Sequence, residues 1–592
     1  MQPIRRIAVA FVFLSVVAWV APSRGDDPSA PKPLKMADVL AWKHVAGATV
    51  SPDGQWFAYL LAPNEGDGEV VVRQTRGDKE MRFPAGEARG GGPGPAAGGG
   101  PVISEDSQWV AFAIHPTTKE GKLLQKQRRP SRNKAALVRL ASGEKTEFDG
   151  VRRFAFSGES ATTLALHGYG AEASTAAPAG PPTGPPATTP PAGATPPERP
   201  TGSDLVLREL ATGNELNVGN VAEFAFDKKG QWLALVIDAQ GQHGNGVQLR
   251  NMATGVVIPL DSAKASYRSL NWTEKGDALA VLRGVEDKAY QDKLYSVVGF
   301  TDLGAKTPKK VVYDPHANKT FPANRTISPN RPPTWTDDLS ALLFGIHQPK
   351  KKTEPTPPEK PAIAKKDDKP EAKKATDPKQ EASAKRQAGE DKEKPDLVIW
   401  HYNDDRLQSQ QQVSSGADKS HSYLCTFRVA DKKFVRLADL DMRVVTVAPK
   451  QRWAVGIDRR SYELDGTLDG KQYHDVYVID LKTGERKLAL KKNRWNYTES
   501  PDGTHLLYYE DGQFYTLEFA NCQTYNVTRE VPTSFVNDED DHPVANPPRA
   551  PVGWTQDGAF VLLSDGWDVW KVPVHGGKGV NLTVNGKKES IR

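Results

Sequence analysis

The chain has 592 residues, of which 38% are apolar and 26% charged, and its net charge at pH 7 is +5. Three of these charges, Arg5, Arg6 and Arg24, lie near the N-terminus, and residues 350–394 add a surplus of four. The remainder carries a net charge of −2, which excludes the basic footprint of a nucleic-acid-binding protein. Acidic residues alternate with the lysines of 350–394, so this segment is interpreted as a solvated linker rather than a polyanion-binding arm.

The N-terminus has the features of a secretory signal peptide. Two arginines precede an apolar run over residues 7–20, and small residues surround Gly25. A membrane anchor is the alternative, but the run is shorter than the roughly 20 residues that span a bilayer. We expect a signal peptide over residues 1–25 and a mature protein that is exported to the periplasm or the extracellular space, without a membrane span.

The next feature is a short segment over residues 26–46, in which Met36–Trp42 is predicted to form a helix. A turn motif of the Ser-Pro-Asp-Gly type then recurs nine times up to the end of the chain. Its clearest copy is Ser51-Pro52-Asp53-Gly54, followed by the alternating strand that begins at Trp56. The nine copies start at Ser51, Ser104, Ser157, Asp227, Thr273, Thr336, Ala448, Ser500 and Thr555.

The repeat predicts an all-β fold. Each unit of roughly 45 to 55 residues holds four short strands, which is the pattern of a β-propeller blade. We therefore expect a single large propeller over residues 47–592, with about eight blades, one of the nine units being irregular. A β-sandwich and two stacked smaller propellers are the alternatives. The motif tryptophans, Trp56, Trp109, Trp232 and Trp453, are expected to pack between blades.

Three low-complexity segments interrupt the repeat and are expected to form loops outside the blades. Residues 85–101 are Gly-rich, 173–201 are rich in Pro, Ala and Thr, and 349–395 are rich in Lys, Glu and Pro. Only two cysteines are present, Cys425 and Cys522, and they fall in different repeats. Buried unpaired thiols are the default expectation for them, and a disulfide between blades is the alternative.

No catalytic motif accompanies the repeat. The sequence contains no Gly-x-Ser-x-Gly elbow, phosphate loop, HExxH pair or dinucleotide fingerprint. No cofactor and no metal is predicted on this basis. One acidic cluster remains as a candidate contact for a substrate amine or a calcium ion, with a solvated loop as the alternative. Its residues are Asp538, Glu539, Asp540, Asp541 and His542.

A second candidate contact is Arg406, in the polar stretch that follows Trp400. It is placed either toward the central channel of the propeller or in a salt bridge with Asp404 or Asp405 inside its own blade.

Several of these residues together resemble the N-terminal propeller of secreted bacterial serine peptidases of the prolyl oligopeptidase family (S9). The resemblance is carried by the Ser51–Tyr59 opening, by Ile399–His401 with Arg406–Gln411, by Asp538–Pro543 leading to Gly553–Thr555, and by Asp565–Val572 followed by Asn581–Thr583. Single blades also resemble those of the periplasmic protein TolB. In that peptidase family the propeller covers an α/β-hydrolase domain and filters peptides, and the catalytic triad lies on the hydrolase.

The resemblance implies a non-catalytic propeller that gates or binds peptide, or docks a hydrolase. No position matches a catalytic residue of that family, so the chain is expected to be inactive alone, with the hydrolase domain absent from it. The alternative is a stand-alone, TolB-like periplasmic propeller that acts as a protein-interaction scaffold. The partners expected are peptides or a hydrolase, and no nucleic acid.

Overall fold

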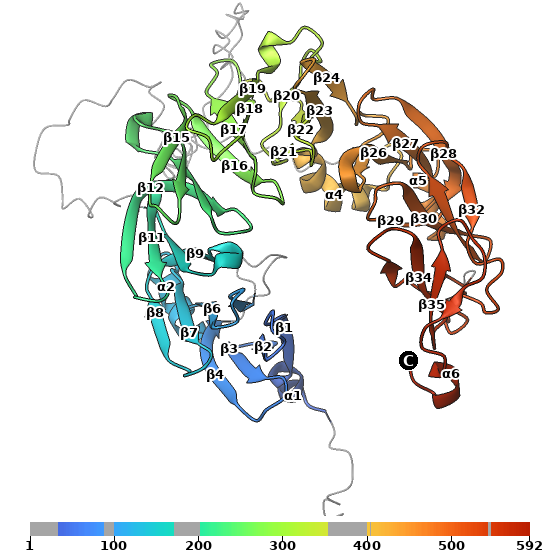
Figure 1. The fold of residues 1–592 in the computed structure, drawn as a ribbon, viewed down its shortest axis with the longest axis horizontal. Helices are drawn as coiled ribbons and strands as arrows, with labels where there is room; N and C mark the ends of the chain where they lie inside the picture. The colour runs from blue at the N-terminus through green and yellow to red at the C-terminus, as the bar shows by residue number, and fades with distance from the viewer. Residues whose placement is uncertain (1–33, 88–99, 171–201, 353–398, 403, 543–545) are drawn as a thin grey trace, which may run out of the picture. The chain divides into compact units, whose positions relative to one another are not determined.

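The computed structural model describes residues 34–87, 100–170, 202–352, 399–402, 404–542 and 546–592. Most of these residues lie in short antiparallel strands, drawn as twisted sheets in Figure 1. Contacts divide the chain into two compact units, one formed by residues 1–103 with 110–147 and the other by 104–109 with 148–592. The predicted signal peptide and most of the three low-complexity segments lie outside the described residues.

The first unit contains helix α1, helix α2 and two four-stranded sheets, each built from strands that are consecutive in the chain. Helix α1 is Met36–Ala41 and helix α2 is Thr118–Lys126. The strands of the first sheet are β1 (Lys43–Val50), β2 (Trp56–Pro63), β3 (Asp67–Gln74) and β4 (Glu80–Glu87). Those of the second are β5 (Val102–Ile103), β6 (Trp109–Ile114), β7 (Lys134–Arg139) and β8 (Lys145–Phe148).

The second unit opens with a seven-stranded sheet that contains two blades, followed by the four-stranded sheet β16–β19. The seven strands are β9 (Val151–Phe156), β10 (Thr163–Gly168), β11 (Ser203–Glu209), β12 (Glu215–Phe226), β13 (Trp232–Ile237), β14 (Gly246–Asn251) and β15 (Val257–Ser262). The next four are β16 (Ser266–Trp272), β17 (Leu279–Val285), β18 (Leu294–Thr301) and β19 (Lys309–Tyr313).

Four further sheets complete this unit, and helices α4, α5 and α6 lie among them. The first has β20 (Thr326–Ile327), β21 (Thr334–Trp335), β22 (Ala341–His347), β23 (Tyr423–Arg428) and β24 (Lys433–Arg436). The second has β25 (Val444–Val447), β26 (Trp453–Asp458), β27 (His474–Asp480) and β28 (Arg486–Asn493). The third has β29 (Trp495–Glu499), β30 (His505–Glu510), β31 (Gln513–Glu518) and β32 (Thr524–Asn526). The last has β33 (Gly553–Trp554), β34 (Phe560–Ser564), β35 (Val569–Pro573) and β36 (Val580–Asn581).

Strand β12 serves two blades. Its first half, up to Val218, pairs with β11 as a fourth strand, and its second half, from Glu223, pairs with β13 as a first strand. The chain turns between the halves at Asn220, whose φ is 58°. When β12 is counted in both, the described residues form nine blades, one for each copy of the turn motif. This one-to-one match confirms the all-β, propeller-type fold of four-stranded blades.

Every motif copy except the one at Ala448 closes the turn between the first two strands of its blade through its own side chains. In the first copy the Ser51 hydroxyl accepts a hydrogen bond from the N–H of Trp56 (2.9 Å), and the Asp53 carboxylate accepts one from the N–H of Gln55 (3.0 Å). The same contact from a Ser or Thr hydroxyl to the N–H five residues later recurs in the copies at Ser104, Thr273, Thr336, Ser500 and Thr555. The conserved chemistry of the motif is therefore structural.

One copy offers a direct test of this structural role. The Thr336 hydroxyl is buried, accepts from the N–H of Ala341 (3.0 Å) and donates to Asp338 (2.7 Å). Thr336→Val keeps the shape but leaves a buried N–H unpaired, so we expect the free energy of unfolding to fall by about 1–2 kcal/mol. Urea unfolding followed by tryptophan fluorescence measures the change. Thr254→Val, at an exposed turn with a 3.4 Å bond, is the control and should change stability by less than about 0.5 kcal/mol.

The glycines of the motif bring successive turns into contact. Gly503 has a φ of 71°, and a Cβ built on it would overlap the carbonyl oxygen of Pro449, in the turn of the preceding blade. Gly230 stands in the same relation to the carbonyl oxygen of Ser157, whereas nothing lies within 4 Å of such an atom at Gly54. The glycine thus permits both a left-handed turn and the close approach of the neighbouring blade.

The hydrophobic core lies between blades rather than inside one. A representative cluster combines Val236 and Leu249 of the β12–β15 blade with Leu279, Val281 and Phe300 of the β16–β19 blade, all at most 1% exposed. The predicted inter-blade packing of the tryptophans holds for Trp56, Trp232 and Trp453, which lie in or against such clusters. Both cysteines are free; Cys425 is buried, as expected, and Cys522 is half-buried.

Helices are the main departure from the sequence analysis, which expected a helix only over Met36–Trp42. That helix is confirmed as α1, but α2, α4 (Gln408–Ser420), α5 (Glu463–Asp469) and α6 (Gly586–Glu589) were missed. Helix α2 begins with a capping box between Thr117 and Glu120, a signal that the sequence displays.

Two predicted boundaries also shift. Strand β1 begins at Lys43, ahead of the expected residue 47, and residues 85–87, assigned to the Gly-rich loop, belong to β4, where Ala85 is buried. Among the described residues, no helix combines the length and apolar character required to cross a membrane.

Candidate functional site

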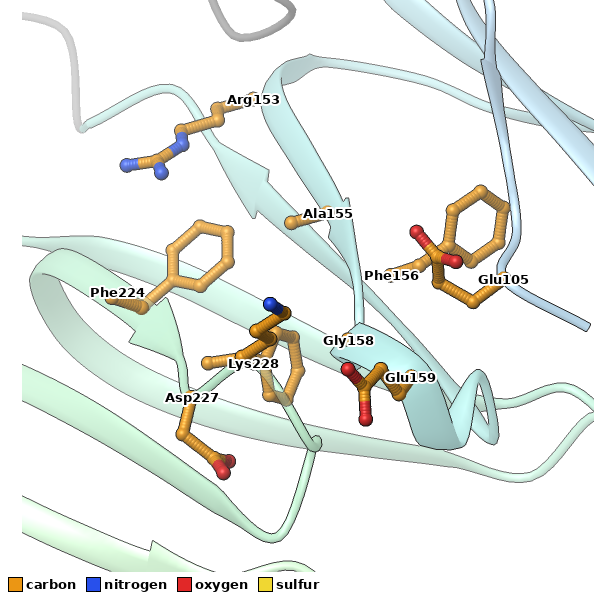
Figure 2. A pocket seen from close by; sticks show the side chains of 11 residues that line it. Glu105, Arg153, Ala155, Phe156, Gly158, Glu159, Phe224, Asp227 and Lys228 are labelled. Carbon is orange, nitrogen blue, oxygen red and sulfur yellow. The ribbon is translucent and has the colours of Figure 1, made fainter. Parts of the chain in front are cut away.

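A pocket of about 410 Å³ lies where β9 and the second half of β12 end side by side (Figure 2). Both are the first strands of their blades, and the turn motifs that follow them complete the wall. The short 3₁₀ helix Gly158–Ser160 and the turn at Asp227 and Lys228 belong to these motifs. We call this hollow the Arg153 pocket; its lining residues are Glu105, Arg153, Ala155, Phe156, Gly158, Glu159, Phe224, Ala225, Phe226, Asp227 and Lys228.

Arg153 provides the main cationic group of the pocket. Its guanidinium lies 4.8 Å from the centre of the Phe224 ring, and in Figure 2 it projects above that ring. Its Nε is buried and has no hydrogen-bond partner among the described residues. Burial lowers the pKa of Arg153, although the charge of Glu223 opposes the shift. A half-buried guanidinium with a buried, unused Nε–H donor is a binding position for a carboxylate or another oxyanion.

The guanidinium of Arg153 stacks on Phe224, a ring that is itself packed in place. The ring is only 1% exposed and makes edge contacts with His167 (5.6 Å between centroids) and Phe226 (6.4 Å). An arginine stacked on an immobile ring loses little further freedom when it binds a ligand. The half-buried rings of Phe156 and Phe226, which also line the pocket, offer apolar area beside the cation.

Carboxylates and one lysine line the rest of the pocket. Asp227 is used by its own turn, since its carboxylate accepts from the N–H of Trp232 (2.6 Å). The ammonium of Lys228 lies 3.2 Å from Glu274, and its carbonyl accepts from the N–H of Glu159 (2.8 Å). Glu159 and Glu105 add negative charge on the side away from Arg153, as Figure 2 shows. The pocket therefore presents both signs of charge around an aromatic wall, which suits a zwitterionic or peptide-like ligand.

A serine and a histidine meet near the pocket, but their geometry is structural. The Ser203 hydroxyl lies 2.9 Å from Nε2 of His167, and both residues are buried. That same Nε2 lies 2.8 Å from the carbonyl oxygen of Val221. A carbonyl only accepts, so Nε2 carries the proton and donates it to Val221. Ser203 in turn bonds the carbonyl of Gly168 (3.0 Å). A protonated Nε2 does not act as a base toward Ser203.

A larger hollow of about 750 Å³ lies along the first strands of four later blades. Its wall includes Asn271, Thr334, Val445 and Glu499, with Arg331 beside them. Burial raises the pKa of Glu499 and lowers that of Arg331. Both hollows are thus lined by the first strands of blades, and charged side chains in both are partly buried.

The acidic cluster predicted from the sequence lies in the loop between β32 and β33, and its carboxylates do not converge on one point; Arg549 is shared by Asp538 and Glu539. Asp538 lies 3.0 Å from the guanidinium of Arg549, and Glu539 pairs with Arg592. Asp540 accepts from the N–H (3.0 Å) and from Nδ1 (2.8 Å) of His542. Asp541 is exposed. Three of the four carboxylates are therefore engaged in different contacts; a substrate or ion contact here stays a prediction.

The ion pairs of Arg406 differ from the predicted salt bridge, and a position toward the central channel stays a prediction. Arg406 lies 2.8 Å from Asp418 in helix α4 and 3.6 Å from Glu463 in helix α5, not beside Asp404 or Asp405. Asp404 instead accepts from the side-chain amide of Gln411 (3.0 Å). The sequence analysis missed this arrangement because it did not predict the two helices that supply the carboxylates.

The sequence analysis also missed Arg153. The available signal was the pair Arg152-Arg153 within a first strand that is otherwise apolar, Val151–Phe156. Alternation places one arginine on each face of the strand. The structure agrees, since Arg152 is exposed and Arg153 is half-buried in the pocket.

Comparisons with known proteins give likenesses of fold only. No protein-family model matches the chain, and no curated protein matches its sequence. A structure from a study of two prolyl endopeptidases is 12% identical with a TM-score of 0.32; the match covers 81% of this chain and 55% of that one. A eukaryotic initiation factor structure is 12% identical with a TM-score of 0.35, covering 82% and 89%. The β-propeller domain of the Trilobed protease from Pyrococcus furiosus is 9% identical with a TM-score of 0.26, covering 76% and 99%.

The low sequence identities and TM-scores give no evidence about function. The chain spans about half the length of the prolyl endopeptidase that it matches. TM-scores below 0.5 assign no function, and the matches include both peptidase propellers and an initiation factor. The strand pairing and the repeated turns carry the fold assignment: the chain is built from four-stranded propeller blades, with a charged pocket where two first strands end.

Proposed function

We propose that this chain is the non-catalytic propeller of an exported serine peptidase system of the prolyl oligopeptidase type, and that it binds peptide through the Arg153 pocket. The observation that carries the proposal is the half-buried guanidinium of Arg153, held over Phe224 with its buried Nε unpaired among the described residues. Such a group binds the C-terminal carboxylate or an acidic side chain of a peptide, and the aromatic wall accommodates a neighbouring apolar side chain.

In this role the propeller selects or holds peptide for a hydrolase supplied by another domain or another polypeptide. The resemblance of the sequence motifs to that peptidase family supports this part of the proposal. The Ser203–His167 geometry supports the non-catalytic part, since the histidine already donates to a backbone carbonyl. The purified chain is accordingly expected not to react with a fluorophosphonate probe, and covalent labelling of a serine would contradict the proposal.

The binding role is tested by a matched pair of variants on one strand. Arg153→Met and Arg152→Met remove the same charge from neighbouring positions of β9, but only Arg153 lines the pocket. Binding of a fluorescein-labelled peptide library to the full chain, followed by anisotropy, should weaken at least about 10-fold in Arg153→Met, since charge-assisted hydrogen bonds contribute about 1.5–3 kcal/mol. Arg152→Met should bind like the wild type.

Two results would contradict the peptide-binding role. One is equal loss of binding in both variants, which would indicate a general effect of net charge. The other is the absence of peptide binding by the wild-type chain, which would favour the alternative of a TolB-like interaction scaffold. Folding is not expected to limit the test, because Arg153 is only half-buried and methionine replaces most of its apolar stem.

A further inference from the structure

Two histidines and a glutamate from adjacent blades meet at one point away from the Arg153 pocket. His505 is the first residue of β30 and Glu518 is the last residue of β31, and the two are paired across the sheet. His575 follows β35 of the next blade. One ligand-type atom from each side chain lies within 4.8 Å of the other two. Among the described residues, these three form the one group of His, Cys, Asp or Glu side chains that lie close enough together to hold a metal ion.

Hydrogen bonds fix which nitrogen of His505 is available. The Thr504 hydroxyl lies 2.7 Å from Oδ2 of Asp502 and 2.7 Å from Nδ1 of His505. A hydroxyl has one proton, and the carboxylate only accepts, so Thr504 donates to Asp502 and accepts from Nδ1–H of His505. The other nitrogen, Nε2, then carries a lone pair. His505 is 6% exposed, and its Nε2 is buried without a hydrogen-bond partner.

This arrangement is the one that metal-binding histidines use. A second group holds one ring nitrogen, which fixes the tautomer and directs the lone pair of the other toward the ion. A buried polar atom without a partner also carries a cost that a ligand would remove.

Glu518 is oriented in a similar way. Its Oε2 accepts hydrogen bonds from the side-chain amide of Asn521 (3.0 Å) and from the hydroxyl of Tyr525 (3.0 Å). Both bonds go to the same oxygen, which leaves Oε1 for a cation. His575 packs against Tyr525, with 4.6 Å between ring centroids, and is otherwise exposed to solvent. The same ring lies 5.2 Å from the ring of His505, between centroids, so it already stands beside the first ligand.

We propose that His505, Glu518 and His575 bind a divalent transition-metal ion of the zinc type, which links the β29–β32 blade to the β33–β36 blade. Two imidazoles and one carboxylate are a donor set that zinc accepts, with a fourth position left for water. Zinc ligands at about 2.1 Å from the ion lie roughly 3.4 Å apart in a tetrahedron. The ligand atoms of the three side chains already lie within 4.8 Å of one another, so small side-chain adjustments are enough to reach this spacing.

The experiment uses the full chain after dialysis against EDTA. Titration with Zn²⁺ by isothermal calorimetry should give one saturable site per chain, and Co²⁺ should give the visible absorption of a low-symmetry, nitrogen-containing site. Ca²⁺ and Mg²⁺ should not compete, because they prefer all-oxygen ligands. His575→Ala and Glu518→Gln should each weaken zinc binding at least about 100-fold, and Thr504→Val should weaken it about 10- to 100-fold through the orientation of His505.

A matched control separates the site from adventitious binding by histidine. His316→Ala also removes one exposed histidine but leaves the cluster intact, and it should bind zinc like the wild type. The proposal is overturned by the absence of a saturable zinc site in the wild-type chain, or by zinc binding that survives in His575→Ala. His575 is exposed, so its replacement leaves the buried core unchanged. The result is independent of peptide binding at the Arg153 pocket.

Discussion

Replacing Gly503 by alanine is expected to destabilise the β29–β32 blade by about 3–5 kcal/mol, although it adds one methyl group. The residue has a φ of 71°, which already costs an L-residue about 1–2 kcal/mol. The added Cβ would also overlap the carbonyl oxygen of Pro449, which belongs to the turn of the preceding blade. Neither backbone can yield without moving a whole turn, so the two blades must separate or distort.

The repeat supplies the control for this experiment. Gly54 occupies the same motif position with a φ of 70°, but a Cβ there would meet nothing within 4 Å. Gly54→Ala should therefore cost only the conformational 1–2 kcal/mol, roughly. Hydrogen exchange followed by mass spectrometry reads the opening free energy of each blade separately. Equal losses in the two variants would show that the turn conformation alone, and not the contact between successive turns, determines the requirement for glycine.

The contrast between Gly503 and Gly54 also shows where sequence reasoning was sufficient. The motif predicted a turn between two strands at every copy, and the hydroxyl of Ser51 or Thr336 makes the bond that such a turn requires. Local chemistry repeated along the chain therefore predicted the blades. About eight were expected because one of the nine units was taken as irregular, whereas in the described residues every copy of the motif has its own blade. The packing of one turn against the next was not predictable, because it depends on how neighbouring blades approach.

The helices were missed for a different reason. Helix α4, with the sequence from Gln408 to Ser420, has no buried residue and little apolar periodicity. Its position depends on Asp418, which lies 2.8 Å from both Arg406 and Arg443. These ion pairs join residues 12 and 25 positions apart in the sequence. A hydrophobic pattern does not indicate such contacts. The salt bridge considered for Arg406 was therefore one with Asp404 or Asp405, whereas its partners are Asp418 and Glu463.

The Arg153 pocket and the His505–Glu518–His575 cluster both join residues that are far apart in the sequence, which made them hard to predict. Arg153 meets Phe224 across 71 positions of the chain, and His505 meets His575 across 70. In both cases one blade contributes one side of the site and the next blade the other. In these blades the residues of one site come from two neighbouring repeats, whereas a sequence motif describes residues within one repeat. Contacts between neighbouring blades are therefore the places where function is to be sought in this chain.

A buried carboxylate between two such blades should have the second large effect. Asp261, on β15, accepts from the ammonium of Lys310 (3.0 Å) and from the hydroxyl of Tyr267 (2.9 Å), and it lies 3.5 Å from the guanidinium of Arg283. Its side chain is 4% exposed, and the three partners belong to the β16–β19 blade. Asp261→Asn leaves two cations without their counter-charge. We expect the free energy of unfolding at pH 7 to fall by about 2–3 kcal/mol, the lower end for a broken buried pair because Lys310 is partly exposed.

The effect should depend on pH in a defined direction. Burial alone would raise the pKa of Asp261, but the hydrogen bonds from Lys310 and Tyr267 and the nearby positive charges outweigh it, and the pKa is lowered. The carboxylate therefore stabilises the folded state above its unfolded pKa of about 3.9, and this contribution is lost as the pH falls through the folded pKa. The free energies of unfolding of the wild type and Asp261→Asn, measured in urea, should differ at pH 7 and converge progressively below about pH 4.

The control is Asp302→Asn, which removes an exposed partner of Lys309 at 2.8 Å on the same blade and should have little effect on stability at any pH. A difference between wild type and Asp261→Asn that persists in acid would mean that packing of the side chain, rather than its charge, joins the two blades.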